Sequence, residues 1–213
     1  MARKFDEMLM KAVKDGNTGR AEELLAEKAD AGATDVNGRT ALFHAAWRGD
    51  LDMAKLLFNY GAEANVVDDD GEGPLVRALM ERRYDVAEWL VKDARADVNL
   101  KAGEKGMTPL HWAYNMDLRD NTTDRALWLV RHGADPMVED AQHRNIYQRG
   151  EEDTRWPAGK KVADSIAFHF SEVARIAKEE KEAALQAEIS SAVYGGAGAP
   201  VPVKTIRLKQ FDQ

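Results

Sequence analysis

The stretch Asp35–Asn65, DVNGRTALFHAAWRGDLDMAKLLFNYGAEAN, decides the fold of this chain. Its Asn37-Gly38 pair offers the positive φ of a tight hairpin turn. Thr40 can cap a helix that Gly49 ends, and a second helix follows. Apolar residues fall on one face of each helix, so the stretch predicts a turn and two short amphipathic helices. A pair of helices this short cannot bury both faces alone and needs a neighbour on each side.

The same pattern recurs along the chain. The alanines Ala12, Ala45, Ala78 and Ala113 follow one another at intervals of 33, 33 and 35 residues. The segment 108–113, TPLHWA, falls in the same register. A 33-residue period with this segment in phase resembles the ankyrin repeat family over roughly residues 5–147. In that family the Thr and His of the segment hydrogen-bond around the turn. The second unit departs from the pattern, because Phe43-His44 swaps the usual His and Leu and puts that network in question.

The resemblance implies an all-α fold, an ankyrin-repeat solenoid of about four to five helix-turn-helix repeats with β-hairpin tips. A long C-terminal helix and an extended tail follow the repeats. The expected domains are the repeats in 1–150, divided as 5–34, 35–67, 68–101, 103–137 and a degenerate 140–150, then the C-terminal helix in 151–192, and a flexible linker with a basic tail in 193–213.

Three segments interrupt or follow the repeats. Residues 117–124, DLRDNTTD, are too many for the turn inside the fourth unit and predict an exposed loop. Residues 151–159 predict another loop. Helical phase predicts a helix over 160–190, whose first half seals the last repeat. Its second half carries opposite charges at i,i+3 and i,i+4 and is expected to project into solvent.

The composition excludes several classes of function. A net charge of −7 argues against general nucleic-acid binding, which requires a basic face. The chain has no cysteine, so disulfides, thiol nucleophiles and cysteine-ligated zinc are excluded. No apolar run is long enough to predict a membrane span, and the first residues lack an apolar signal core. We expect a cytoplasmic protein, with export by another route left open.

No set of catalytic groups stands out. The five histidines are scattered, and no serine lies in a nucleophile elbow. The acidic run 68–72 lacks the ligand spacing of a calcium loop. We therefore expect no enzyme activity, no cofactor and no metal site.

The resemblance implies that the hairpin tips and the outer side of each first helix form a concave surface for a protein partner. Trp47 stands out because a polar residue normally occupies its position in the repeat. Exposed Trp and Arg residues often anchor interfaces. The alternative is that Trp47 folds back as plain core. Trp89, Trp112 and Trp128 are expected in the core. Carried over by position, the partner-binding candidates are Asn37, Arg39, Trp47, Arg48, Tyr60, Asp69, Asp70, Glu72, Met80, Glu81, Lys105, Met107, Asn115 and Met116.

The sequence therefore predicts a non-enzymatic protein–protein interaction module, monomeric on its own. The acidic tip at Asp69, Asp70 and Glu72 favours a partner with a basic patch. One alternative is an inhibitor or immunity-type protein that blocks an enzyme with its acidic tips. Another is a secreted effector adaptor whose tail, 203–211, serves as a docking or export signal.

Overall fold

The computed structural model describes residues 2–152 and 158–193. The chain divides after Val173 into two units, and the residues of the last helix are shared between them. Residues 153–157 of the predicted second loop, and the predicted linker and tail from residue 194 on, lie outside the described residues. The helices are α1 (Ala2–Asp15), α2 (Thr18–Ala26), α3 (Ala41–Arg48), α4 (Leu51–Asn59), α5 (Pro74–Met80), α6 (Tyr84–Lys92), α7 (Pro109–Asp120), α8 (Asp124–Arg131), α9 (Ile146–Glu152) and α10 (Ala158–Val193).

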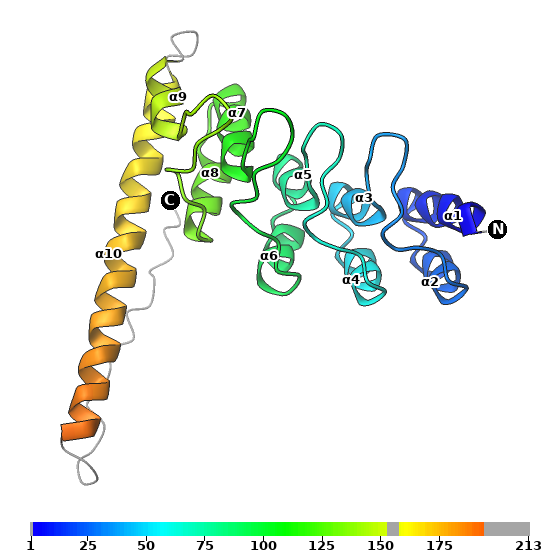
Figure 1. Cartoon of the computed structure of the whole chain (residues 1–213), viewed down its shortest axis with the longest axis horizontal. Coiled ribbons are helices and arrows are strands. Elements are labelled where there is room, and N and C mark those ends of the chain that lie inside the picture. Colours follow the sequence, from blue (N-terminus) through cyan, green and yellow to red (C-terminus); the bar gives the residue numbers. More distant parts are fainter. Residues whose placement is uncertain (1, 153–157, 194–213) are drawn as a thin grey trace. The chain divides into compact units, whose positions relative to one another are not determined.

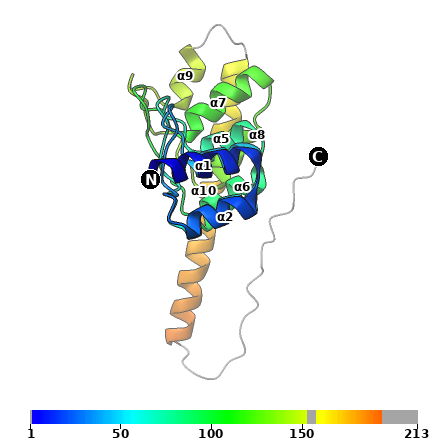
Figure 2. The same ribbon diagram turned by 90° about the vertical axis from the view of Figure 1, so that its right-hand side faces the viewer.

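The first eight helices form four consecutive pairs, as the sequence predicts. The first helices, α1, α3, α5 and α7, lie side by side in one layer, and α2, α4 and α6 lie side by side in a second (Figures 1 and 2). The loops that join one pair to the next form a row of hairpin-like fingers along one edge of these layers (Figure 1). Each pair packs only on its neighbours, which is the organisation of a repeat array.

The helix ends follow the predicted local chemistry. The Thr40 side chain accepts a hydrogen bond from the Phe43 amide at 3.1 Å and caps α3. Gly49 ends that helix in the left-handed conformation, with a φ of 75°. Pro74 occupies the first turn of α5, where a missing amide hydrogen costs no hydrogen bond.

The Thr–His network forms in the fourth unit. The His111 amide donates to Thr108 Oγ1, and His111 Nδ1 accepts from the Thr108 amide at 3.2 Å. His111 Nε2 donates to the backbone oxygen of Arg144 at 3.2 Å and so links α7 to the next finger. In the second unit Phe43 takes the histidine's place and only the threonine half of the network remains.

Three of the fingers are closed by an aspartate at the same position. In the finger at 35–39, Asp35 Oδ1 accepts from the amides of Asn37 and Arg39, at 3.0 and 3.2 Å. Asp68 and Asp140 make the same pair of bonds to the amides two and four residues later. Each carboxylate therefore satisfies two backbone donors that the short turn leaves unpaired.

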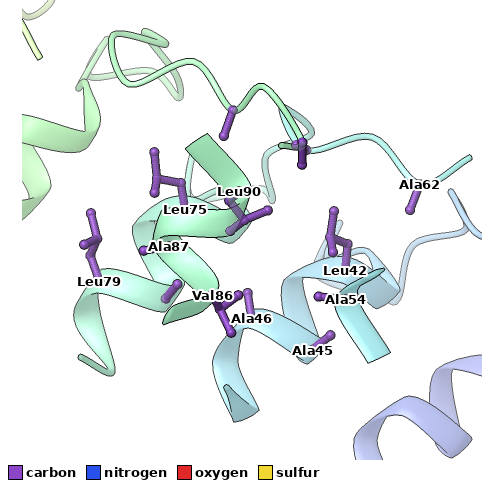
Figure 3. Packing of buried hydrophobic residues seen from close by; sticks show 14 of the residues in the cluster. Leu42, Ala45, Ala46, Ala54, Ala62, Leu75, Leu79, Val86, Ala87 and Leu90 are labelled. Carbon is purple, nitrogen blue, oxygen red and sulfur yellow. The ribbon is translucent and has the colours of Figure 1, made fainter. Parts of the chain in front are cut away.

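The core lies between the two layers of helices. Figure 3 shows the alanines and leucines of the second and third units meeting there. Ala45, Ala46 and Ala87 are fully buried, and their small side chains let neighbouring helices approach closely. Each buried leucine contributes about 1.5–3 kcal/mol relative to exposure. The N-terminal part of α10 adds Val162 and Ile166 to the same core.

The predicted exposed loop at 117–124 is wrong. Residues 117–120 extend α7 by a further turn, and Asp117 and Leu118 are both buried. Arg125, at the start of α8, is 2% exposed and pairs with Asp117 at 3.0 Å. The inserted residues therefore form a longer helix that holds a buried ion pair, and the connection to α8 is short.

Arginines from one unit reach the end of the first helix in the preceding unit. Arg48 Nη1 donates to the backbone oxygen of Lys14, near the end of α1, at 3.0 Å. Arg83 lies against the end of α3, since a Cβ built on Gly49 would be 2.6 Å from its Cδ. Arg125 donates to the backbone oxygen of Leu79 at 3.0 Å. Each cation lies where a helix dipole is negative, so each stabilises the contact between adjacent units.

The helix α10 begins two residues earlier and ends three residues later than predicted. Within the second unit, the described side chains from 178 to 185 are exposed. The pairs Arg175–Glu179 and Lys178–Glu182 form at 2.7 and 3.9 Å, as the i,i+4 pattern predicts. Among the described residues, none of the helices combines the length and the apolar character that crossing a bilayer requires.

Candidate functional site

Trp47 lies in the last turn of α3 with 40% of its surface exposed. Its ring stacks against His44 with centroids 6.1 Å apart and meets the Phe43 ring edge-on at 6.4 Å. The guanidinium of Arg77, from the next unit, lies 5.0 Å from the ring centroid. These contacts fix the ring by cation–π and aromatic packing while leaving part of it open to a partner.

A cavity of about 380 Å³ opens beside this ring. It is lined by residues of the first two units: Lys14, Asp35, Asn37, Arg39, His44, Trp47 and Arg48. The volume is at the lower end of the range for ligand pockets and suits one or two side chains of a partner. The structure therefore brings four of the predicted residues, Asn37, Arg39, Trp47 and Arg48, to one place.

A hydrogen-bonded cluster of Lys14, Asp35 and the buried His44 forms one wall of the cavity. Asp35 Oδ2 accepts from Lys14 Nζ at 3.0 Å and from His44 Nε2 at 2.9 Å. Burial acts to raise the pKa of Asp35, but these bonds and two backbone amides lower it well below its usual range. Burial lowers the pKa of His44 and outweighs the opposing bond to Asp35. The wall thus holds a neutral imidazole against an ionised carboxylate at neutral pH.

The acidic tip of the third unit is largely paired within the chain. Asp68, which is buried, accepts from Arg39 Nε at 3.0 Å. Glu72 is only 7% exposed and forms an ion pair with Arg77. Burial raises the pKa of Glu72 more than Arg77 lowers it. Of the three residues predicted to meet a basic partner, only Asp69 and Asp70 are exposed, and the prediction for Glu72 is wrong because its carboxylate is turned inward.

Family profiles match most of the segment that forms the paired helices. A profile described as ankyrin repeats (3 copies) matches residues 9–102, and a single ankyrin repeat matches residues 105–141. Together they cover more than half of the chain, from the second half of α1 to α8. The chain belongs to the ankyrin repeat family.

Several curated proteins match this chain over part of their length. "Ankyrin repeat and SOCS box protein 16" of Homo sapiens is 40% identical over 98 residues, which is 46% of this chain and 21% of that protein. "Tyrosine-protein kinase HTK16" of Hydra vulgaris is 29% identical over 112 residues, 51% of this chain and 15% of the relative. "Neurogenic locus Notch protein" of Drosophila melanogaster is 33% identical over 103 residues, 48% of this chain and 4% of the relative. The chain thus spans about a fifth or less of the length of these relatives.

The remaining candidates on the ankyrin surface are spread over the third and fourth units. Met80 and Glu81, at the end of α5, are half-buried, and Glu81 lies 3.7 Å from Arg77. Asn115 and Met116 are half-buried in α7, where Asn115 Oδ1 accepts from Arg149 at 3.2 Å. These residues extend the first-helix row beyond the cavity.

Three further candidates fall elsewhere. Lys105 is exposed in the finger at 102–107, which belongs to the fourth unit. Met107 is 6% exposed, so its prediction as a contact residue is wrong: it pairs with Ala102 to close the finger and faces the core. Tyr60 is exposed at the end of α4 but does not line the cavity.

The other predicted core tryptophans are only partly buried. Trp89 and Trp128 pack against the core, as expected, and Trp112 is half-buried in α7. Trp89 meets the Phe58 ring edge-on at 5.6 Å, between the second helices of adjacent ankyrin repeats.

Sequence reasoning gave no site role to Asp35, His44 or Arg77. The swap at Phe43-His44 was a signal for His44, because it moves the histidine one position along α3 and toward the finger. Arg77 carries no such signal, since its contact with Trp47 crosses from one repeat to the next. Among the residues that the structure describes, no cluster of histidine and carboxylate side chains could hold a metal ion.

Proposed function

We propose that this chain is a non-enzymatic module that binds another protein through the fingers and first helices of its first three ankyrin repeats. Ankyrin repeats generally act as protein–protein interaction modules, and the chain carries them over residues 9–141. The proposal includes no catalytic step and no cofactor.

The exposure of Trp47 carries the proposal. A tryptophan that served only as core would be buried, whereas Trp47 stays 40% exposed beside a cavity. Its position is fixed from both sides, by His44 in its own helix and by Arg77 in the next unit. A preorganised aromatic anchor loses little conformational entropy on binding, which is the physical basis of an interface hot spot.

Two other hypotheses remain predictions. The enzyme inhibitor was inferred from an acidic tip, and the structure pairs two of its carboxylates, Asp68 and Glu72, within the chain. The effector adaptor was inferred from residues 203–211, which lie outside the described residues. Neither hypothesis gains support from the cavity beside Trp47.

The test is affinity capture from the native cell lysate with three versions of the chain. They are the wild type, Trp47→Ala/Met80→Ala, and Met137→Ala, which removes an exposed methionine outside the surface. Loss of a hot-spot anchor costs about 2 kcal/mol or more, which weakens binding roughly 30-fold. We expect a protein that the wild type and Met137→Ala recover and the folded double variant does not. Equal recovery by all three would refute the proposed surface.

A further inference from the structure

The charges that line the cavity do not balance. Three of its seven lining residues are cations, Lys14, Arg39 and Arg48, and one, Asp35, is an anion. Lys14 is matched by Asp35 at 3.0 Å, and Arg39 by the buried Asp68 at 3.0 Å. Arg48 forms no ion pair with any described carboxylate, and its one hydrogen bond goes to a backbone oxygen.

Arg83, one unit further along, also lies at a helix end without a paired carboxylate among the described residues. It lies against Gly49 as Arg48 lies against Gly16, and these two glycines are 33 residues apart in equivalent positions. Arg83 also forms no ion pair among the described residues. Its neighbour Arg82 pairs with Asp120 and Asp124 instead.

The third arginine of this kind, Arg125, does form ion pairs within the chain. Arg125, one unit further still, takes the same position at a helix end and pairs with Asp117 and Asp120 at 3.0 and 2.7 Å. Both carboxylates come from the extra turn of α7, which the earlier first helices lack. In those units the same position stays open to a carboxylate from outside the chain.

We infer that this surface selects a partner segment with two carboxylate side chains, one paired with Arg48 and one with Arg83, and an apolar residue that packs on Trp47. The inference rests on the proposed function and adds the chemistry of the partner. It replaces the basic partner that the sequence predicts, because the acidic tip is partly neutralised by Arg39 and Arg77.

Guanidinium chemistry and geometry both favour carboxylates. A guanidinium has five N–H donors, and Arg48 uses one on Lys14, so donors remain for a bidentate carboxylate. The helix end holds each arginine in place without cancelling its full charge. Adjacent packed helices lie about 8–10 Å apart, which an extended chain spans in about three residues. Asp15 is exposed near this row but forms no ion pair with Arg48.

The experiment is a selection of binders from a display library of random peptides. Peptides are kept if they bind the wild type and fail to bind Trp47→Ala/Met80→Ala, so that only ligands of this surface are counted. We expect them to be rich in Asp and Glu. On Arg48→Glu/Arg83→Glu the selected peptides should become rich in Lys and Arg. The control Lys55→Glu/Arg131→Glu makes the same charge change at exposed positions on α4 and α8 and should still select acidic peptides.

A titration then measures each arginine alone. Fluorescence polarisation of one selected acidic peptide should show binding about tenfold weaker in Arg48→Gln and again in Arg83→Gln, the size of one charge-assisted contact. Lys55→Gln should leave the affinity unchanged.

Different outcomes separate the two proposals. If the selected peptides are basic or neutral, the acidic partner is overturned but the binding surface is not. The same holds if the selected peptides are acidic but bind equally well when both arginines are replaced. If every peptide that binds the wild type also binds the Trp47→Ala/Met80→Ala variant, so that the selection keeps none, both proposals are overturned. A dimer in sedimentation that Arg48→Glu/Arg83→Glu dissociates would identify a second copy of the chain as the occupant, and would also overturn the acidic segment.

Discussion

Replacing Arg125 with alanine tests the buried network that joins the third and fourth repeats. The guanidinium bonds to Asp117 and Asp120 and to the backbone oxygens of Leu79 and Met80, at 3.0, 2.7, 3.0 and 3.5 Å. Asp117 is fully buried. The substitution therefore leaves a carboxylate in the interior without its cation.

The expected loss follows from that burial. Breaking a buried ion pair by removing one partner costs about 3–5 kcal/mol. Asp117 keeps two other donors, the Thr122 hydroxyl at 3.0 Å and the Ala126 amide at 2.9 Å, which places the loss at the lower end, about 3 kcal/mol. For a chain of this length, the melting temperature should fall by roughly 6–12 °C.

The assay is urea and thermal unfolding followed by circular dichroism and tryptophan fluorescence. Arg82→Ala is the matched control, because Arg82 contacts the same Asp120 but is 44% exposed in its side chain. Exposed pairs contribute about 1 kcal/mol or less, so this variant should unfold nearly as the wild type does.

Equal effects of the two substitutions would refute the reasoning. That result would mean that residues 117–124 form the solvated loop that the sequence predicts. A second variant checks the cause of the loss: Asp117→Leu/Arg125→Met replaces the ion pair with apolar side chains of similar size. It should recover part of the stability that Arg125→Ala loses, since the uncompensated charge is gone but the Ala126 amide loses its acceptor.

Two further predictions concern pH and glycine. Burial lowers the pKa of His44 and His111, so the unfolded chain binds protons more readily than the folded chain does. As the pH is lowered through about 6.5, the free energy of unfolding should therefore decrease. The decrease is at most about 1.4 kcal/mol per pH unit for each histidine. His44→Gln should flatten this slope in urea titrations from pH 7 to 5, and an equal slope in the wild type and in this variant would contradict the assignment. Gly71→Ala should destabilise the chain by more than the about 1–3 kcal/mol of backbone strain alone, because its φ is 82° and a Cβ would lie 2.7 Å from the next finger's backbone. Gly61→Ala, with a φ of 94° and open space around it, should cost the strain only, and equal losses in thermal melts would show that the fingers are not in close contact.

The sequence predicts the repeat fold because its determinants are local. Thr40 and Gly49 mark the ends of α3 from their own chemistry, and the Thr108–His111 pair closes within one turn. The 33-residue period then places each pair against the next, since no other neighbour can bury its apolar face.

The extra turn of α7 was missed because the segment is rich in polar residues. Leu118 does continue the helical phase of Leu110 and Tyr114, which was the available signal. The pairing of Asp117 with Arg125 could not be deduced, since both residue types normally lie on the surface. Their burial depends on carbonyl groups of the preceding unit, which only the packed array brings near.

The candidate surface was predicted in outline and missed in detail for a related reason. Trp47 and Arg48 were found because their residue types are unusual in their slots. Glu72 and Met107 were chosen by position in the repeat, and position does not tell which way a side chain turns. Glu72 turns inward because Arg77 lies beneath it, five residues along the chain.

The contact of each arginine with the first helix of the preceding unit has a consequence for the insertion and duplication of repeats. A segment that starts at one finger and ends before the next carries both the helix end that receives an arginine and the arginine that fastens to the unit before it. Copying one whole unit would therefore supply both an arginine and a helix end that can receive one. The chain is thus built to change length in whole units, and its row of cations lengthens with it.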